Sequence, residues 1–251
     1  MLKPEQRHRY KRNIMLEGIG EQGQEKLLKS RVLIVGAGGL GSAVAYYLAA
    51  AGVGHLGLVD GDLVDLSNLQ RQILYQTGDL GKPKAEVAKA RLEALNPDLE
   101  VEAICGKLDE ENAHLLISRY DLVVDCTDNF VARFIINDTC LRLGKPFVHG
   151  AVSDFSGQVM TIIPGAGPCF RCIFPKEPKN YSASDSGVLS SLPGTIGTVQ
   201  ATEVIKYILG LGDLLVSRLL VYDALSITFS EVSVARSPCC PVCSENATGY
   251  Q

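Results

Sequence analysis

The sequence lacks a hydrophobic run long enough to cross a membrane. No apolar stretch reaches the roughly 18 residues that a spanning helix needs, and the first residues, MLKPEQRHRYKR, lack the apolar core of a signal peptide. A basic surplus is also missing, since 24 Lys and Arg stand against 28 Asp and Glu. A generic nucleic-acid binder needs such a surplus to neutralise phosphates. We therefore expect a soluble, cytoplasmic protein that binds neither membranes nor nucleic acid.

Cysteine is too sparse for a small, disulfide-stabilised secreted domain, because eight cysteines are spread over 251 residues. Reduced thiols or metal ligands are the better interpretation in a chain of this length. Internal repeats are absent from the sequence as well. With 46% hydrophobic residues the chain can bury a large core, which predicts one continuous domain.

Strand-like apolar runs alternate with helical patterns over much of the chain. The runs are VLIVG (32–36), HLGLVD (55–60), EVEAICG (100–106), LVVDC (122–126) and PFVHGAV (146–152). The helical patterns between them are GSAVAYYLAAAG, KAEVAKARLEALN and VARFIINDTCLRLG. This alternation predicts an α/β fold with a Rossmann-like, mostly parallel sheet and helices on both of its faces.

The chain divides into successive parts along its length. Residues 1–30 have a polar, helical pattern, and residues 31–155 form the Rossmann-like half. In residues 156–251, the runs GQVMTIIP, RLLVYDA and ITFSEVSVA resemble antiparallel strands that extend the sheet. Residues 175–193, rich in proline and serine, are predicted to form a crossover loop.

A glycine-rich loop follows the first strand-like run. In VLIVGAGGLG, Gly36, Gly38 and Gly41 have G-x-G-x-x-G spacing, and the loop opens a helix whose first N–H groups can receive an anion. Asp60 ends the next strand, where a ribose hydroxyl would lie. The unit predicts a nucleotide site without choosing between NAD and ATP. Glycines that only let the helix pack on the sheet are the structural alternative.

The segment after the second strand favours ATP. It reads DGDLVDLSNLQRQILYQTGDLGKPKAEVAKAR and contains Asp62, Asn68, Arg71, Gln72 and Lys84. A nicotinamide needs an apolar slot with few charges, whereas a triphosphate needs several fixed cations and donors. Arg71 and Lys84 suit the triphosphate. Each of them alone would more often be a solvated surface charge.

Further strings extend the pattern along nearly the whole chain, from about residue 9 to residue 243. They are RYKRNI, GAGGLGS, AGVGHLGLVDGD, LSNLQRQILY, GKPKAEVA, DLVVDCTDN, CFRC, GTIGTVQATEVIK and CPVC. On these strings the chain resembles the MoeB/ThiF/HesA family, the bacterial relatives of ubiquitin-activating enzymes. Members adenylate the sulfur carriers of molybdopterin and thiamine biosynthesis. The resemblance implies ATP and Mg²⁺ as cofactors, and as partner a ubiquitin-like carrier protein that ends in Gly-Gly.

The resemblance also implies roles for individual residues. Gly39 and its neighbours in the loop would approach the phosphates, and Asp60 would hold the ribose. Asn68, Arg71 and Lys84 would contact the triphosphate, with Gln72 in the same nucleotide site. Asp128, in DCTDN at a strand end, resembles the acid that organises Mg²⁺, with Asp62 assisting it. A helix N-cap is the structural alternative for Asp128, because the helix VARFIINDTCL follows it.

Arg12, in RYKRNI, resembles the arginine that family dimers pass to the ATP phosphates of the partner subunit. The resemblance therefore implies a homodimer in which Arg12 acts in trans. As a bare sequence feature, Arg12 belongs to a basic N-terminal stretch, for which a solvated terminus is the simpler interpretation.

The cysteines include two pairs with two-residue spacing, Cys169-x-x-Cys172 and Cys240-x-x-Cys243. Four thiolates in tetrahedral geometry make a closed structural zinc site, which would fasten the C-terminus to the crossover region. A thioredoxin-like redox pair is disfavoured, because neither pair opens a helix in a βαβ unit. Cys239 beside Cys240 leaves a second register open. Three other cysteines lie in apolar segments and are predicted to be buried: Cys105, Cys126 and Cys140.

One position departs from the family pattern. Members usually carry a cysteine in the crossover loop a few residues before a Gly-Val pair, and this sequence has Ala183 there. Ser182 and Ser184 are too weakly acidic to replace it. Either the protein only adenylates its carrier, or Ala183 is an engineered replacement. Because eight residues follow Cys243, we expect the sulfur to come from a separate donor, a cysteine desulfurase or a rhodanese-like protein.

Carrier adenylation is thus the favoured function, and two functions of other classes remain as alternatives. An NAD-dependent oxidoreductase would explain the glycine loop but would leave Arg71, Lys84 and Asp128 without a function. A non-catalytic carrier-binding scaffold is disfavoured because the candidate ATP residues are all present. The sequence leaves open whether the carrier belongs to molybdopterin, thiamine, cysteine or tRNA-thiolation chemistry.

Overall fold

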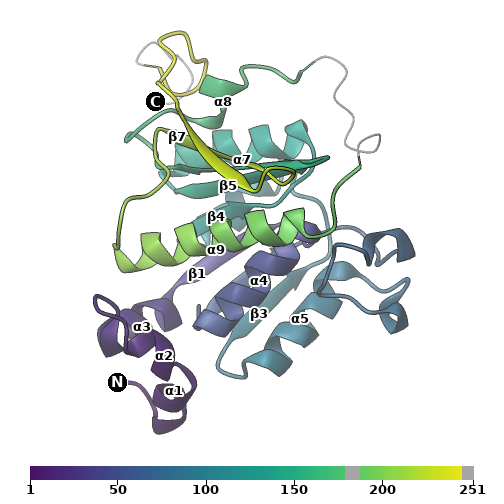
Figure 1. The fold of residues 1–251 in the computed structure, drawn as a ribbon, viewed down its shortest axis with the longest axis vertical. Helices are drawn as coiled ribbons and strands as arrows, with labels where there is room; N and C mark the ends of the chain where they lie inside the picture. The colour runs from purple at the N-terminus through teal and green to yellow at the C-terminus, as the bar shows by residue number, and fades with distance from the viewer. Residues whose placement is uncertain (179–186, 245–251) are drawn as a thin grey trace.

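The computed structural model describes residues 1–178 and 187–244 and contains one eight-stranded sheet with the order β3-β2-β1-β4-β5-β6-β7-β8 (Figure 1). Its strands are β1 (Arg31–Val35), β2 (His55–Val59), β3 (Glu100–Ile104), β4 (Leu122–Asp125), β5 (Phe147–Ser153), β6 (Ser156–Ile162), β7 (Arg218–Asp223) and β8 (Thr228–Ser233). The pairs from β3 to β5 are parallel, and those from β5 to β8 are antiparallel. The predicted α/β sheet with an antiparallel extension is confirmed.

Helices cover both faces of this sheet. They are α1 (Pro4–Arg9), α2 (Lys11–Ile14), α3 (Gly20–Lys29), α4 (Gly39–Ala51), α5 (Lys84–Leu95), α6 (Ala113–Ser118), α7 (Phe130–Leu143), α8 (Phe170–Ile173) and α9 (Leu192–Leu209), with short 3-10 turns η1 (Leu66–Asn68) and η2 (Thr77–Asp79). In the part of the chain that the structure describes, no helix is long and apolar enough to cross a bilayer.

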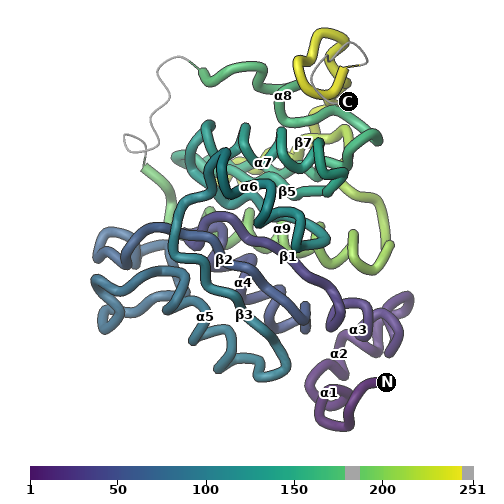
Figure 2. The backbone as a smooth tube through the Cα atoms, turned by 180° about the vertical axis from the view of Figure 1, so that it is seen from behind, coloured from purple at the N-terminus to yellow at the C-terminus, as the bar shows by residue number. Residues whose placement is uncertain are grey.

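Successive residues of β1 show how the two faces are filled. Val32 and Ile34 belong to a core cluster with α4, α5 and α9 (Figure 1). Leu33 and Val35 point the other way and join a second cluster with α6 and α7, seen from behind in Figure 2. A parallel strand that is buried on both faces reads as a continuous apolar run, because successive side chains alternate between the faces.

Helix α9 was not predicted from the sequence. Its 18 residues, LPGTIGTVQATEVIKYIL, include glycine and several β-branched residues, which are poor helix formers. The helix packs closely on α4: a Cβ added at Gly197 would lie 2.7 Å from the carbonyl oxygen of Leu40. Tertiary packing therefore stabilises this helix more than its own propensity does.

The N-terminal helices are anchored to the end of α5. Tyr10, between α1 and α2, is 2% exposed, and its hydroxyl accepts a hydrogen bond of 2.9 Å from Nδ2 of Asn96. Asn96 also donates to the carbonyl oxygen of Ala49 at the end of α4. These buried hydrogen bonds fix the point at which α2 begins.

Candidate functional site

A cavity of about 1030 Å³ lies at the carboxyl ends of β1, β2 and β4. Within the sheet, β2 and β3 lie on one side of β1, and β4 and β5 lie on its other side. The cavity is thus at the point where the strand order reverses, which is where open α/β sheets bind ligands.

Most of the predicted nucleotide residues line this cavity, namely Gly36, Gly38, Gly39, Asp60, Asp62, Arg71, Gln72, Lys84 and Asp128. The structure also describes the three remaining residues predicted for the ATP site. These lie outside the cavity wall: Gly41, Asn68 and Arg12. Sequence reasoning missed Lys107, Asp109 and Arg133, which also line it.

The glycines of the loop have separate structural tasks. Gly36 has φ +94°, and its N–H donates to the carbonyl oxygen of Val59 at the end of β2. Gly38 caps the N-terminus of α4, so the helix begins at Gly39, and its first turn lines the cavity. A Cβ at Gly41 would lie 2.0 Å from the carbonyl oxygen of Gly36. Gly41 therefore permits close packing of helix and loop, which was the structural alternative.

Asp60 is held by backbone donors at the end of β2. Its carboxylate accepts hydrogen bonds from the N–H of Ala37, at 2.7 Å, and from the N–H of Asp62, at 2.8 Å. Burial outweighs these hydrogen bonds and raises the pKa of Asp60 above its usual value. The hydroxyl of Tyr75 donates to the carbonyl oxygen of Ala37, which fixes the loop from its other side.

Lys84 places a buried positive charge at the cavity wall. Its side chain is 5% exposed, and Nζ lies 3.0 Å from the Asp62 carboxylate, which is 60% exposed. The Lys84 N–H also donates to the carbonyl oxygen of Asp62. A buried ammonium needs an anionic partner. A phosphate that entered the cavity could share or replace Asp62 in this pairing.

Arg71 and Gln72 follow the 3-10 turn η1. Nη1 of Arg71 donates to the carbonyl oxygen of Ser67 at 3.2 Å. Gln72 is buried, and within the described part of the chain its Oε1 has no hydrogen-bond partner. A buried acceptor without a partner suggests a missing donor, such as a ligand group. Asn68 lies in η1 itself, with Nδ2 at 3.4 Å from the Ser67 hydroxyl.

Asp128 is exposed in the loop between β4 and α7 and lines the cavity. The helix N-cap is the next residue, Asn129, whose Oδ1 accepts a 2.9 Å hydrogen bond from the N–H of Ala132. The capping role considered for Asp128 thus belongs to Asn129. Oδ1 of Asp128 in turn accepts a hydrogen bond of 3.4 Å from Nδ2 of Asn129.

A buried polar pair under this loop was also missed from the sequence. Asp125, the last residue of β4, and His149 of β5 are each 1% exposed, with 2.7 Å between Oδ2 and Nδ1. The signal was available, because both are ionisable residues inside apolar strand runs. Such residues are rarely buried unless they are paired.

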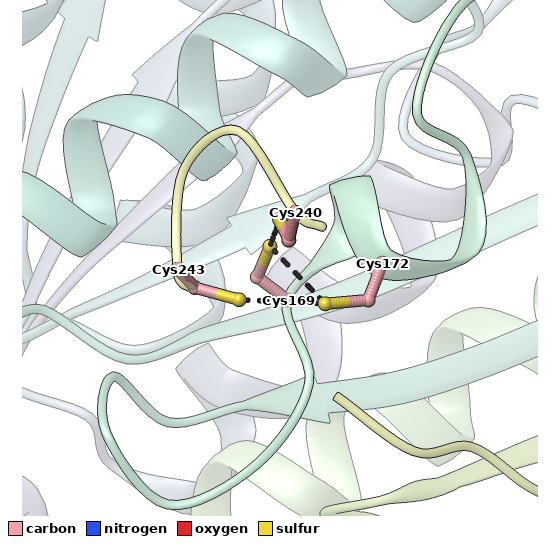
Figure 3. A group of neighbouring side chains, drawn as sticks. All are labelled: Cys169, Cys172, Cys240 and Cys243. Atoms are coloured by element: carbon pink, nitrogen blue, oxygen red, sulfur yellow. Dashed lines mark hydrogen bonds between the residues drawn. The ribbon is translucent and has the colours of Figure 1, made fainter. Parts of the chain in front are cut away.

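Four cysteines from two distant parts of the sequence lie close together (Figure 3). The sulfur atoms of Cys169, Cys172, Cys240 and Cys243 all lie within 4.8 Å of one another. Tetrahedral zinc with Zn–S of about 2.3 Å requires sulfur separations of about 3.8 Å. The observed contacts of 3.3, 3.6 and 3.9 Å lie around that value, so the cluster could hold zinc.

The electrostatics of the cluster suit a cation. Burial and a hydrogen bond with Cys172 raise the pKa of Cys243 to about 11. Burial also acts on Cys240, but backbone N–H groups of Cys243 and Val242 outweigh it and lower the pKa of that thiol. Several buried thiolates can coexist only if a cation compensates their charge.

The four cysteines outside the cluster differ in burial. Cys126 and Cys140 are buried, as expected, but Cys105 is exposed, so that prediction was wrong. Cys105 follows the last residue of β3, where the chain turns into the cavity wall at Gly106, and the apolar run before it does not continue. Cys239 is exposed and Cys240 joins the cluster, which decides the register between them.

The fold and the cavity define a protein of the Rossmann-like α/β class with a four-cysteine cluster. The ThiF family model matches residues 10–242, and the chain belongs to this family.

Similar proteins carry related names. The chain is 48% identical to the SAMP-activating enzyme E1 of Haloferax volcanii, over 94% of this chain and 88% of the relative. It is 47% identical to the sulfur carrier protein adenylyltransferase of Thermus thermophilus, over 97% and 93%. It is also 47% identical to the adenylyltransferase and sulfurtransferase MOCS3 of Drosophila sechellia, of which it spans 53%.

Solved structures of E. coli MccB have the same fold. The MccB structure with MccA-N7isoASN has a TM-score of 0.85 at 25% identity, covering 94% of this chain and 75% of MccB. The MccB structure with ATP has a TM-score of 0.79 at 27% identity, covering 88% and 68%.

Proposed function

We propose that this protein uses ATP to adenylate the C-terminal Gly-Gly carboxylate of a ubiquitin-like sulfur-carrier protein, releasing pyrophosphate. The observation that carries the proposal is the cavity, which combines a helix N-terminus with Arg71, Lys84 and Asp128. The family and the names of the relatives support the same activity.

The reaction needs alignment and charge neutralisation more than bond-making groups. A carboxylate oxygen of the carrier attacks the α-phosphorus, and the bond from that phosphorus to the bridging oxygen of pyrophosphate breaks. Since a carboxylate is a weak nucleophile, the enzyme must hold it in line and stabilise the charge that develops on the phosphates. Lys84 and Arg71 supply positive charge that would stabilise the phosphates. The partial positive charge of the α4 N-terminus at Gly39 adds to it.

Asp128 and Asp62 fit a Mg²⁺ ion at the phosphates. Both are exposed carboxylates at the cavity wall, and this cation takes one or two carboxylates together with phosphate oxygens. When bound, the ion would neutralise phosphate charge. Asp62 can fill this role once a phosphate takes over its pairing with Lys84.

The four-cysteine cluster is proposed to hold one structural zinc ion. All ligand positions would be sulfur, which leaves no open site for chemistry. The ion would join the segment around α8 to the segment after β8.

The carrier and its pathway set the biological role. Molybdopterin or thiamine synthesis, or a related sulfur-transfer pathway, would consume the activated carrier. A separate cysteine desulfurase or rhodanese-like protein would supply the sulfur. Ala183, Ser182 and Ser184 of the crossover loop lie outside the described residues. With no thiol at position 183, we propose adenylation alone at this enzyme.

Pyrophosphate release tests the function directly. The ubiquitin-like Gly-Gly proteins of the source organism are incubated in turn with the enzyme, Mg²⁺, ATP and labelled pyrophosphate, and the label that enters ATP is measured. One of them is expected to support ATP–pyrophosphate exchange at least about 100-fold above background, because the aligned carboxylate is the nucleophile. The matched control is the same carrier without its last glycine, which should give background exchange.

Two outcomes would contradict the proposal. Saturable NADH binding, with no ATP binding in a parallel titration, would favour an oxidoreductase. Tight binding of ATP and of a carrier without any exchange would favour a non-catalytic scaffold.

We also propose that the enzyme acts as a homodimer to which Arg12 contributes in trans. Arg12 is exposed on α2, outside the described wall of its own cavity. Tyr10 anchors the start of that helix through its hydrogen bond with Asn96. An arginine in this position is available to a partner, where its fixed charge would suit phosphate.

Subunit mixing tests this arrangement. Arg12→Ala and Arg71→Ala dimers are each expected to lose about 100-fold in exchange activity, as removal of one transition-state contact does. After random subunit exchange, half of the dimers are mixed and each holds one intact site, so about a quarter of wild-type activity should return. A tagged-subunit pull-down verifies exchange. If activity stays at the level of the single variants although exchange has occurred, Arg12 does not act across the interface.

A further inference from the structure

A buried network holds the loop that carries Asp128. Its centre is Asp125, whose two carboxylate oxygens are divided between two partners. Oδ2 lies 2.7 Å from Nδ1 of His149. Oδ1 accepts from the Thr127 N–H at 3.0 Å and from the Thr127 hydroxyl at 2.7 Å. The carboxylate thus links a strand residue to the residue that directly precedes Asp128.

The contacts fit a carboxylate paired with a neutral imidazole. Burial acts to raise the pKa of Asp125, but the hydrogen bond from His149 and the nearby Arg133 charge hold it below its usual value. Burial lowers the pKa of His149. A neutral imidazole with its proton on Nδ1 donates to Asp125, and Nε2 then accepts from Nε2 of Gln158 on β6 at 3.3 Å. Each polar atom of the pair therefore has a partner.

Thr127 is also held from the opposite side. Its carbonyl oxygen accepts a hydrogen bond of 2.9 Å from Nη2 of Arg133, a residue of α7 that is 4% exposed. Gln200 of α9 donates to the carbonyl oxygen of Asp125 at 2.8 Å. The backbone on the N-terminal side of Asp128 is fixed by groups from β4, β5, α7 and α9.

On the C-terminal side, Asn129 caps α7 and fixes the start of the helix. Asp128 is the exposed residue between these two fixed points. A buried ionic pair is a costly way to stabilise a strand end, because apolar residues of similar volume often serve as well or better. Val123 and Val124 of the same strand are buried apolar residues that need no ionic partner. The pair is better explained by the direction that it gives to the loop.

We infer that Asp125 and His149 form a positioning pair, which holds Asp128 in the geometry that adenylation requires. The inference rests on the proposed role of Asp128 in that reaction. Neither residue of the pair lines the cavity within the described chain, so neither is assigned contact with ATP or carrier. Their effect would pass through Thr127 to the carboxylate of Asp128.

A double-mutant cycle tests the pair. Asp125→Asn is expected to lower kcat for carrier-dependent exchange by about 30- to 100-fold with KM for ATP within about threefold, since a small misplacement of a reacting group costs about that much. Asp128→Glu keeps a carboxylate but displaces it. In that background, Asp125→Asn should lower kcat further by less than about threefold. Residues that act through one another give such non-additive losses.

Two substitutions of His149 supply a matched comparison. His149→Asn retains a donor near the position of Nδ1 and should keep at least about a third of wild-type kcat. His149→Leu removes the donor and should lose about as much as Asp125→Asn, because the carboxylate is left without its partner. The double-mutant cycle with Asp128→Glu is repeated with His149→Leu in place of Asp125→Asn. If one of these two variants fails to fold, the other still tests the positioning role.

The outcomes separate the possible explanations. An additive loss in the Asp128→Glu background would overturn positioning and leave the proposed function intact. Wild-type kcat in Asp125→Asn would do the same. Wild-type kcat in Asp128→Glu and in Asp128→Ala would overturn both the role of Asp128 and the pair that serves it. Loss of the fold in both Asp125→Asn and His149→Leu would assign the pair a structural role alone.

Discussion

Replacing Asp128 with alanine is expected to lower carrier-dependent ATP–pyrophosphate exchange by at least about 10³-fold, or about 4 kcal/mol of transition-state stabilisation. The Asp128 side chain is exposed at the cavity wall, in the loop that follows the parallel strand β4. Loss of a group that organises Mg²⁺ on the phosphates removes charge stabilisation from the reacting centre. Exchange rates measured at saturating ATP and carrier would show the loss.

The fold should survive this substitution, because Asn129 rather than Asp128 caps α7. The thermal midpoint is expected to change by less than about 2 °C, as for most surface substitutions. Asp213→Ala is a matched control: Asp213 is also an exposed aspartate, but it lies outside the described cavity wall. Activity of Asp128→Ala within about threefold of wild type would remove Asp128 from the catalytic site.

Removal of the proposed zinc from the cysteine cluster is expected to lower the thermal midpoint by about 6 to 20 °C. Binding of structural zinc contributes directly to folding free energy, and a loss of about 3 to 5 kcal/mol shifts the midpoint of a domain of this size by about 6 to 20 °C. The cluster joins residues 169–172 to residues 240–243, so the segment after β8 would lose its attachment. Calorimetry before and after chelation measures the shift.

Two variants separate zinc loss from the loss of a thiol. Cys243→Ser removes a member of the cluster and should reduce both the zinc content and the thermal midpoint. Cys239→Ser removes an exposed neighbour outside the cluster and should leave both unchanged. Atomic spectroscopy should find one zinc per wild-type chain. Zinc well below one per chain, or an unchanged midpoint after its removal, would contradict the structural role.

ATP binding should persist when the metal is lost. None of the described residues that line the cavity belongs to 169–172 or 240–243. The dissociation constant for ATP is therefore expected to stay within about threefold, since sites without shared contacts rarely couple strongly. The same titration in the Asp128→Ala variant distinguishes a defect in binding from one in the chemical step.

Local patterns in the sequence were sufficient for much of the fold. The run HLGLVD predicted a strand over 55–60, and the structure has one at His55–Val59. Runs of this kind are informative because a strand buried on both faces needs apolar side chains at every position. The glycine spacing and the paired cysteines were equally readable, since close backbone approach and metal ligation each demand particular residue types.

Features that depend on long-range contacts were not readable in this way. Helix α9 has weak local propensity and is stabilised by packing on α4, for example where Gly197 meets the backbone of Leu40. Cys105 follows an apolar run, as a buried residue would, yet it is exposed where the chain turns after β3. Burial at the end of a strand depends on where the chain goes next, which the run itself does not specify.

The site shows the same division. Composition, strand ends and family resemblance together selected Asp60, Lys84 and Asp128, and these residues do line one cavity. The pairing of Asp125 with His149 came only with the tertiary structure. The two residues are 24 positions apart and meet because β4 and β5 align in parallel, with Asp125 opposite His149 in the register. A sequence records which side chains can ionise, but the register of neighbouring strands decides which of them are buried together, because only that register brings their atoms within hydrogen-bonding distance.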